Sequence, residues 1–372
     1  MPSSIEPGAP LEALPTPCLI VDEDRLAENL DRAQAFADAQ GVALRPHAKT
    51  HKSPVLAREQ LRRGATGVCV AKLGEAETFA DAGLDDLVMA NTTVGPGNAA
   101  RAARLAARIA FAIGVDHVRQ ADDLAAAATA EGVEIPVRVE IDLGAGRGGV
   151  TPEEAPSFTS RLRDVPGLRL QGLYAYEGFT YDAPTSAALH ERHRETQRRL
   201  VELAERLEPA FPERPIVSLG STPSLSAEVP LLPRVDEIRP GTYVFLDAAQ
   251  AALAGGLERC AAHVLTTVVS RVADRALLDA GSKSLTTDAR PAGVCATRGH
   301  GVVDGRDLVV ARLSEEHGVV EGPGAASLNV GERVRIVPNH VCPVVNLFDR
   351  MVLVRDGRVR RVLPVATRGS VA

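Results

Sequence analysis

The feature that most constrains the fold is a repeated alternation of short β-branched runs with longer helical stretches between residues 42 and 243. The runs expected to be strands are residues 42–44, 67–70, 86–90, 109–113, 136–142, 170–176, 215–219 and 235–239. Stretches rich in Ala, Leu and Arg lie between them, for instance residues 54–63, 73–82, 117–130 and 186–207. Strands that alternate with helices are typical of a parallel sheet covered by helices. The sequence therefore predicts an α/β fold, a (β/α)₈ TIM barrel, with a doubly wound open sheet as the alternative.

After Gln250 the alternation stops. Five further runs read as strands without intervening helices, namely residues 262–271, 308–313, 332–337, 351–355 and 358–363. Asp356-Gly357, between the last two runs, is a hairpin turn signal. We therefore expect a barrel domain over residues 22–250 and a C-terminal all-β domain over residues 251–372, of which residues 1–21 also form part.

Composition excludes several classes of function. The 372 residues are 45% apolar and 24% charged, with a net charge of -6 and no basic stripe, which argues against nucleic-acid or anionic-membrane partners. No apolar run approaches the roughly 20 residues of a membrane span, and the N-terminus has no basic start or apolar core. The five cysteines are odd in number and scattered along the chain, as in a reducing compartment. A cytoplasmic location is expected.

Lys49 is the first candidate for chemistry. It lies in Arg45-Pro46-His47-Ala48-Lys49-Thr50-His51-Lys52, directly after the first expected strand and before a helical pattern. In a barrel, that strand-to-helix turn faces the active site. The neighbours His47, His51, Arg45 and Lys52 disfavour the protonated form of Lys49 and lower its pKa, as a Schiff-base lysine requires. The alternative is a solvated basic loop, and these eight residues alone do not decide between the two.

Other chemically distinctive residues fall at the ends of later strands. Arg147 lies in a glycine-rich loop after the fifth strand, and Tyr174 lies near the end of the sixth. Gly220-Ser221-Thr222-Pro223-Ser224 follows the seventh strand, and Pro240-Gly241-Thr242-Tyr243 follows the eighth. The loops after these last two strands form a recurrent phosphate site of such barrels, because glycine lets backbone N–H groups approach an anion. Phosphate binding competes here with a plain helix cap.

An aldehyde-reactive lysine beside a phosphate site indicates pyridoxal 5'-phosphate (PLP). In these residues the chain resembles the fold-type III PLP enzymes, which have an alanine racemase-like barrel, and within them the D-serine dehydratase and D-threonine aldolase branch. The resemblance extends from Pro15-Thr16-Pro17 to Pro338-Asn339-His340-Val341-Cys342. It implies a Schiff base at Lys49, Arg147 beside the cofactor ring, and a set of phosphate-binding residues: Gly220, Ser221, Thr222, Gly241 and Tyr243. On this basis we add His47 and Tyr174 to the cofactor-binding residues, and expect Lys49, Arg147 and Tyr174 to be catalytic.

His340 and Cys342 are the candidate metal ligands. In a strand, residues two apart point to the same face, with Cα atoms about 7 Å apart, so both could reach one Zn²⁺. Two protein ligands leave positions open, which excludes a closed structural zinc site. An isolated His-x-Cys pair is usually fortuitous, but the resemblance implies a divalent metal here, Zn²⁺ first, with Mn or Mg as alternatives. His317 is a weaker third candidate, whereas the sequence favours a solvated helix face for His190 and His193.

The resemblance implies a lyase that acts on D-configured β-hydroxy amino acids. Dehydration of D-serine, D-threonine or D-3-hydroxyaspartate to a 2-oxo acid and ammonia is the favoured reaction, because Cys342 and the loop after the seventh strand look like those of the dehydratases. The alternative is D-threonine aldolase-type cleavage to glycine and an aldehyde. A non-catalytic PLP-binding protein is the alternative of another class. The chain departs from both branches at Tyr176-Glu177, where a histidine is expected, and the family implies a homodimer.

Overall fold

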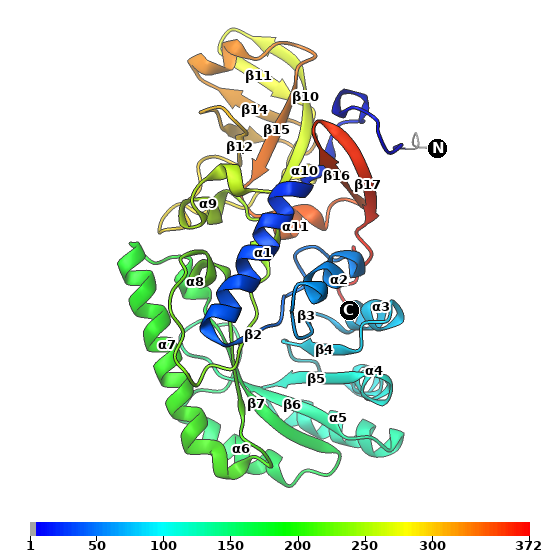
Figure 1. Cartoon of the computed structure of the whole chain (residues 1–372), viewed down its shortest axis with the longest axis vertical. Helices are drawn as coiled ribbons and strands as arrows, with labels where there is room; N and C mark the ends of the chain where they lie inside the picture. The colour runs from blue at the N-terminus through cyan, green and yellow to red at the C-terminus, as the bar shows by residue number, and fades with distance from the viewer. Residues whose placement is uncertain (1–4) are drawn as a thin grey trace.

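The computed structural model describes residues 5–372, so residues 1–4 of the segment 1–21, which is expected to be part of the β domain, lie outside it. Figure 1 shows a lower part in which helices surround parallel strands, and an upper part rich in strands. Helix α1 (Glu23–Gln40) crosses from one part to the other. The Asp22 side chain begins α1 by accepting hydrogen bonds from the amides of Asp24 and Arg25, and Gly41, with φ 66°, ends it.

The lower part contains a parallel sheet of eight strands in the order β2-β9-β8-β7-β6-β5-β4-β3 within the described residues. Its strands are β2 (Ala43–Leu44), β3 (Val68–Val70), β4 (Asp86–Met89), β5 (Ala110–Val115), β6 (Ile135–Glu140), β7 (Leu168–Tyr176), β8 (Ile216–Gly220) and β9 (Glu237–Ile238). A parallel bridge between His47 and Cys69, with a 2.8 Å bond from the Cys69 amide to the Pro46 carbonyl, joins the two ends of this order. The predicted (β/α)₈ barrel is therefore confirmed, and the alternative prediction of an open doubly wound sheet is wrong.

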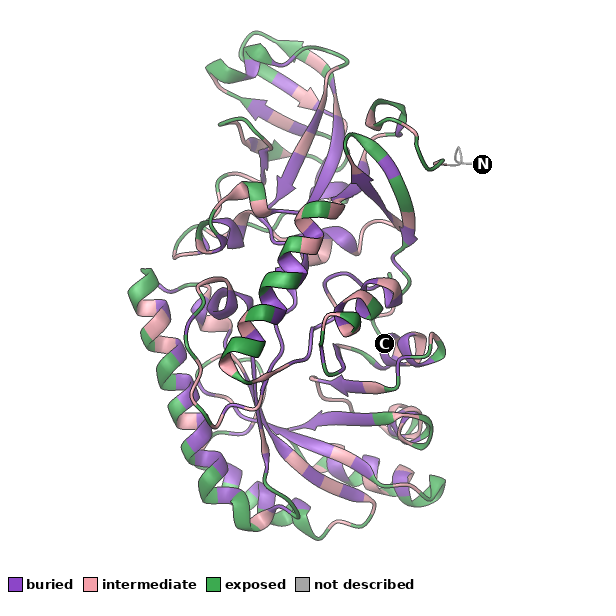
Figure 2. Ribbon diagram, viewed as in Figure 1, coloured by how far each residue is buried: buried purple, intermediate pink, exposed green. Residues whose placement is uncertain are grey.

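Helices connect these strands and cover the outside of the barrel (Figure 1). They are α2 (Pro54–Arg62), α3 (Leu73–Asp81), α4 (Pro96–Arg108), α5 (Val118–Glu131), α6 (Ala155–Arg163), α7 (Ser186–Leu207) and α8 (Thr222–Ser226). Helix α9 (Ala248–Ala254) follows β9, the last barrel strand, and precedes β10 of the upper sheet. Figure 2 shows that each longer helix has one buried and one exposed face, as expected of an amphipathic helix on a sheet. Across residues 5–372, no helix is both long and apolar enough to cross a membrane.

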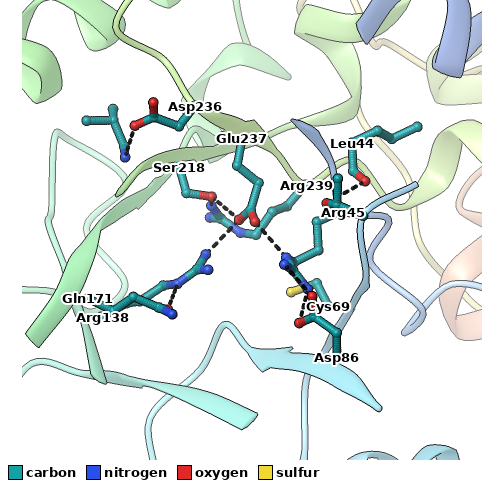
Figure 3. Close-up of polar contacts among 12 residues, drawn as sticks. Leu44, Arg45, Cys69, Asp86, Arg138, Gln171, Ser218, Asp236, Glu237 and Arg239 are labelled. Carbon is teal, nitrogen blue, oxygen red and sulfur yellow. Dashed lines mark hydrogen bonds and ion pairs between the residues drawn. The ribbon is translucent and has the colours of Figure 1, made fainter. Parts of the chain in front are cut away.

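The barrel interior contains a buried charge network around Glu237 on β9 (Figure 3). Its carboxylate accepts hydrogen bonds from Arg45 Nε at 2.6 Å, Arg138 Nη1 at 2.7 Å and Ser218 Oγ at 2.5 Å. Burial alone would raise the pKa of Glu237, but Arg138, Arg45 and Arg239 hold it well below its usual value. Glu237 is thus paired with Arg45 and Arg138, which is the condition for tolerating charge in a core.

The upper part is one sheet of nine strands among the described residues, with the main order β13-β14-β11-β10-β1-β16-β17 and with β15 joining β10 to β12. The strands are β1 (Cys18–Asp22), β10 (Ala262–Val272), β11 (Arg275–Leu278), β12 (Gly301–Val303), β13 (Val310–Leu313), β14 (Gly318–Glu321), β15 (Arg333–Pro338), β16 (Arg350–Arg355) and β17 (Arg358–Pro364). Strand β1 lies antiparallel to β10 and parallel to β16. The N-terminal segment therefore belongs to the sheet made by the C-terminal third of the chain.

This region differs from the all-β expectation in two respects. Strands β11, β12 and β14 are each four residues or shorter, too short for an alternating pattern to reveal them. Two short helices, α10 (Ser282–Leu285) and α11 (Val341–Val345), interrupt the strands. The hairpin turn between β16 and β17 lies where the sequence predicts it, and Asp356 and Gly357 have φ of 52° and 68°. Short 3₁₀ helices cover residues 11–13, 178–180, 208–210, 242–244, 257–259 and 323–327.

Candidate active site

An open cavity of about 430 Å³ lies where the carboxyl ends of the barrel strands face the upper sheet. It brings together residues that the sequence singled out at widely separated positions: His47, Lys49, Arg147, Tyr174, Gly220, Ser221, Thr222, Gly241, His340 and Cys342. The barrel supplies most of these residues, whereas His340 and Cys342 come from the chain that follows β15. The two parts of the molecule thus share one site.

Lys49 enters this cavity from the turn between β2 and α2. Its Nζ atom lies 5.8 Å from the centre of the Tyr176 ring, and the Arg147 guanidinium carbon lies 4.4 Å from the same centre. Tyr176 at the end of β7 is therefore an aromatic surface shared by two cations. The Arg147 loop is anchored by Asp142, which accepts hydrogen bonds from the amides of Gly144 and Gly146.

Three of the four neighbours inferred for Lys49 do not supply a positive charge beside it, which corrects the sequence argument. The fourth, His47, lines the cavity with Lys49, but burial holds its pKa well below the usual value. Arg45 is directed to Glu237 and Asp86, and Lys52 Nζ lies 2.6 Å from Glu75. Burial lowers the pKa of His51 to about 4, so that its ring is neutral at pH 7. Successive side chains of a tight turn point in different directions, so adjacency in sequence did not give adjacency in the cavity. The cations that line the cavity with Lys49 come from other parts of the chain: Arg147, Arg239 and Arg290.

The loops after β8 and β9 meet at one end of the cavity. The Thr222 hydroxyl accepts hydrogen bonds from the amides of Gly241, at 3.3 Å, and Thr242, at 3.1 Å, and so joins the two loops. A Cβ atom at Gly241 would lie 2.8 Å from Thr50 Oγ1, so only glycine allows this close approach. The Ser221 hydroxyl lies 3.0 Å from Thr180 Oγ1. Hydroxyl groups, glycine backbone and nearby arginine make this end suitable for a phosphate.

Two tyrosines differ from expectation. Tyr243 does not line the cavity: its hydroxyl accepts a 2.9 Å hydrogen bond from Gln60 Nε2, and burial raises its pKa. The backbone at this point turns Thr242, rather than Tyr243, toward the cavity. Tyr174 does line it, but its hydroxyl donates a 2.8 Å hydrogen bond to Glu140. Burial, followed by the charge of Glu140, raises the Tyr174 pKa well above its usual value, so that this proton is held firmly.

His340 and Cys342 are not on a strand, contrary to the geometry assumed from the sequence. His340 is the residue before α11 and Cys342 lies in its first turn. The Cys342 Sγ atom lies 3.1 Å from Thr50 Oγ1, and His340 Nδ1 lies 2.7 Å from Asp288 Oδ2. Burial alone would raise the pKa of the Cys342 thiol, but its hydrogen bond with His340 lowers it. Because Asp288 engages Nδ1, Nε2 is the ring nitrogen left for Cys342 or for a metal.

The donor set suits a divalent metal with open coordination positions. An imidazole and a low-pKa thiol are ligands that Zn²⁺ prefers. Within residues 5–372, no three or more His, Cys, Asp or Glu side chains gather in an arrangement that could hold a metal ion, which does not favour a closed structural site. His317 is exposed in the loop between β13 and β14 and does not line the cavity.

His193 and Glu177 form a buried pair that the sequence reasoning missed. His193 Nδ1 lies 2.6 Å from Glu177 Oε1, and the two side chains are 2% and 1% exposed. The assignment of His193 to a solvated helix face is therefore wrong. Its position on α7, four residues after the buried Leu189 and seven before the buried Leu200, is the signal that could have revealed it.

Asp288, Arg239 and Arg290 were also missed. Arg239 directly follows β9, so its place at a strand end was a usable signal. Arg290 and Asp288 lie in the irregular segment between α10 and β12, for which periodicity gives no prediction.

Comparison with known proteins identifies the group to which the chain belongs. Residues 21–249 match the family described as alanine racemase, N-terminal domain. The chain belongs to this family. Residues 261–354 match a second family, described as putative serine dehydratase domain. Family members use PLP, which confirms the resemblance inferred from Lys49 and the two loops.

Several relatives of this alanine racemase-family protein span nearly its whole length. It is 36% identical to a D-threonine aldolase of Arthrobacter sp, over 99% of this chain and 97% of that protein. It is 35% identical to the D-threo-3-hydroxyaspartate dehydratase of Delftia sp. (strain HT23), over 94% of this chain and 97% of the dehydratase. A D-serine dehydratase of Dictyostelium discoideum is 27% identical, over 93% of this chain and 95% of that protein.

Solved structures of an aldolase and a dehydratase are also similar to this chain. A D-threonine aldolase from Filomicrobium marinum superposes with a TM-score of 0.88 at 33% identity, over 100% of both chains. The D-threo-3-hydroxyaspartate dehydratase from Delftia sp. HT23 gives 0.87 at 33% identity, over 95% of this chain and 98% of that one. Two further structures, each of a D-threo-3-hydroxyaspartate dehydratase, carry a replaced histidine and, in a metal-free form, a replaced cysteine two positions later.

Proposed function

We propose that this chain is a PLP- and divalent metal-dependent lyase that dehydrates D-configured β-hydroxy amino acids to a 2-oxo acid and ammonia. The observation that carries the proposal is the convergence of Lys49, the loops at residues 220–222 and 241–242, and the His340-Cys342 pair on one cavity. The related aldolases and dehydratases all have names that specify D-configured hydroxy amino acids or D-amino acids. D-serine, D-threonine and D-3-hydroxyaspartate are the candidate substrates.

Each group of residues would have a separate role. Gly220, Ser221, Thr222 and Gly241 would bind the cofactor phosphate. When bound, PLP withdraws electrons from the substrate α-carbon and makes its bonds labile. Lys49 Nζ, on one side of the cavity, would then take the α-proton, which limits the enzyme to one hand of substrate.

His340 and Cys342 would hold the metal on the side of the cavity that faces the upper sheet. Zn²⁺ is the first choice, and Mn or Mg are the alternatives. The matching spacing of the histidine and cysteine replaced in the related dehydratase supports this assignment. Asp288 would hold the His340 ring in place through Nδ1 and leave Nε2 free to bind the metal.

Retro-aldol cleavage is the second candidate. Its specific support is the D-threonine aldolase of Arthrobacter sp, which at 36% identity is as similar to this chain as the dehydratase of Delftia sp.. The two reactions differ in the first proton removed, from the α-carbon in dehydration and from the β-hydroxyl in cleavage. A non-catalytic PLP carrier is a poorer explanation, because it does not account for the metal-binding pair at the cavity.

The deciding experiment is to supply the full-length protein with PLP, Zn²⁺ and D-threonine and to identify the products. Dehydration gives 2-oxobutanoate and ammonia, whereas cleavage gives glycine and acetaldehyde. Lys49→Ala should lose turnover and the visible absorbance of the bound cofactor, whereas Lys72→Ala, at an exposed lysine before α3, should keep both. Failure to turn over any D-β-hydroxy amino acid with cofactor and metal bound would favour the PLP carrier. Equal turnover of L-threonine would contradict both lyase reactions.

The expected homodimer and cytoplasmic location remain predictions. Light scattering of the purified full-length protein would measure its mass in solution. A mass equal to one 39.2 kDa chain would contradict the dimer.

A further inference from the structure

Arg290 lines the cavity but belongs to neither the proposed cofactor site nor the proposed metal site. Two hydrogen bonds with Thr297 fix its backbone, from the Arg290 amide to Thr297 Oγ1 at 2.9 Å and from the Thr297 amide to the Arg290 carbonyl at 2.8 Å. Its guanidinium carbon lies 4.5 Å from the centre of the Tyr181 ring. The side chain is therefore held against an aromatic surface at a fixed point of the cavity wall.

The charge of Arg290 has little compensation from the protein. Its ion pair is with Asp182, Nη1 to Oδ1 at 3.6 Å, and the Asp182 side chain is 70% exposed. Water screens such a pair, so the guanidinium retains hydrogen-bonding capacity for another anion. The other two arginines of the cavity have buried partners. Arg239 donates to the Ala175 carbonyl at 3.2 Å, and Arg147 lies 3.5 Å from the buried Glu140 carboxylate.

The cavity as a whole carries more positive than negative charge. Lys49, Arg147, Arg239 and Arg290 line it, and no Asp or Glu among the described residues is part of its lining. A cofactor phosphate and one substrate carboxylate would neutralise part of this charge. Arg290, which is not in the loops at residues 220–222 and 241–242, remains available for an additional anion.

Arg290 lies on the metal side of the cavity. It comes two residues after Asp288, whose carboxylate is 2.7 Å from His340 Nδ1. Arg290 and His340 both line the main cavity, and both line an adjoining outer cavity of about 390 Å³. The His340-Cys342 pair marks where the β-hydroxyl of a substrate would lie. The other substituent of that carbon, which is hydrogen in serine, methyl in threonine and carboxylate in 3-hydroxyaspartate, would therefore lie near Arg290.

We infer that Arg290 binds a carboxylate on the β-carbon of the substrate, which makes the preferred substrate class the D-configured 3-hydroxy dicarboxylic amino acids. An arginine side chain is suited to this role because its planar fork can donate two parallel hydrogen bonds to a carboxylate. The inference rests on the proposed lyase function and goes further, because it selects one substrate among those that a lyase of this kind could use.

The first test compares two substrates. For Arg290→Gln, the ratio of kcat/KM on D-threo-3-hydroxyaspartate to kcat/KM on D-threonine should fall by about 10- to 100-fold, the usual effect of losing hydrogen bonds to a charged group. For Arg290→Lys, which keeps the charge but lacks the planar fork of donors, this ratio should fall less. Arg298→Gln is the matched control, because Arg298 is 66% exposed, pairs with Asp307 and does not line the cavity. It should leave the ratio unchanged.

The second test measures binding without turnover. D-aspartate and D-alanine lack the β-hydroxyl, so neither can be dehydrated or cleaved, and they differ by the carboxylate in question. Calorimetric titration of the full-length holoenzyme should show tighter binding of D-aspartate, and Arg290→Gln should remove this preference. The inference would be overturned if Arg290→Gln lost equal affinity for both ligands, or equal kcat/KM on both substrates. D-threonine turnover with poor activity on hydroxyaspartate would also overturn it while leaving the lyase function intact, and absence of all turnover would instead remove the lyase function itself.

Discussion

His193 Nδ1 on α7 lies 2.6 Å from Oε1 of Glu177, which directly follows β7. The Glu177 carbonyl accepts a 2.7 Å hydrogen bond from Thr180 Oγ1, which also lies 3.0 Å from Ser221 Oγ. A buried pair outside the cavity is thus connected to the loop that would bind the cofactor phosphate. We therefore expect Thr180, which does not line the cavity, to help position that loop.

Thr180→Val should weaken PLP binding by about 5-fold, the equivalent of one neutral hydrogen bond. Valine keeps the volume of threonine but cannot contact Ser221 Oγ through a hydroxyl group. Fluorescence titration of the apoprotein with PLP would measure the change. Thr159→Val is the control, because the buried Thr159 hydroxyl has no hydrogen-bond partner among the described residues. A variant with unchanged PLP affinity would show that the Thr180 contact does not support the loop.

Glu237→Gln should lower the free energy of unfolding by about 3 to 5 kcal/mol, because it leaves buried arginines without their shared counter-charge. Arg45 and Arg138 both donate to this carboxylate at 2.7 Å or less. Urea denaturation followed by circular dichroism would measure the loss. Glu202→Gln removes an exposed ion pair with Arg198 and should cost no more than about 1 kcal/mol. Similar losses in the two variants would contradict the role given to the network.

Asp288→Asn should reduce the metal affinity of the protein by about 10- to 100-fold, because the carboxylate no longer orients and polarises the His340 ring. Competition for Zn²⁺ with a chromophoric chelator would measure the affinity without relying on catalysis. Asp307→Asn, at an exposed carboxylate that pairs with Arg298, is the control. Equal Zn²⁺ affinity in both variants would mean that Asp288 does not support a metal ligand.

The stability of the protein should fall between about pH 6.5 and pH 4 through His51. Burial lowers the pKa of this ring from 6.5 to about 4 in the folded protein. Above pH 6.5 the ring is neutral in both states, and as the pH falls the unfolded chain takes up the proton first. The resulting loss reaches about 3 kcal/mol near pH 4.

Urea denaturation at a series of pH values would test this expectation. His51→Asn should be less stable at pH 7, because it loses packing against Phe79, but it should have a flatter pH dependence. His317→Asn, at an exposed position, should retain the dependence of the wild type. An unchanged slope in His51→Asn would show that another group causes the acid sensitivity.

The sequence predicted those features that depend on local order along the chain. All eight barrel strands lie where short β-branched runs predicted them, because most positions of a buried parallel strand are apolar and β-branched residues favour strands. Lys49, Arg147 and Gly220 reached one cavity because the ends of parallel strands meet at one face of a barrel. The domain limits of 22–250 and 251–372 remain predictions.

Features that depend on side-chain direction were predicted less well. Tyr243 and Thr242 are adjacent, yet only Thr242 faces the cavity. His193 pairs with Glu177, which is 16 residues away and on another element. Arg290 lies in an irregular segment whose course is set by hydrogen bonds such as those with Thr297. A linear pattern contains no information about such contacts until the backbone path is known.

The position of β1 has a consequence for synthesis on the ribosome. Cys18 aligns with Leu265 of β10, and Ile20 aligns with Val352 of β16. At about 5 to 20 residues per second, β10 emerges tens of seconds or less after β1, and β16 follows several seconds later. The apolar residues Leu19, Ile20 and Val21 therefore remain without sheet partners while the whole barrel is made. During that interval this short segment is an unpaired strand, which is a candidate for chaperone binding in the nascent chain.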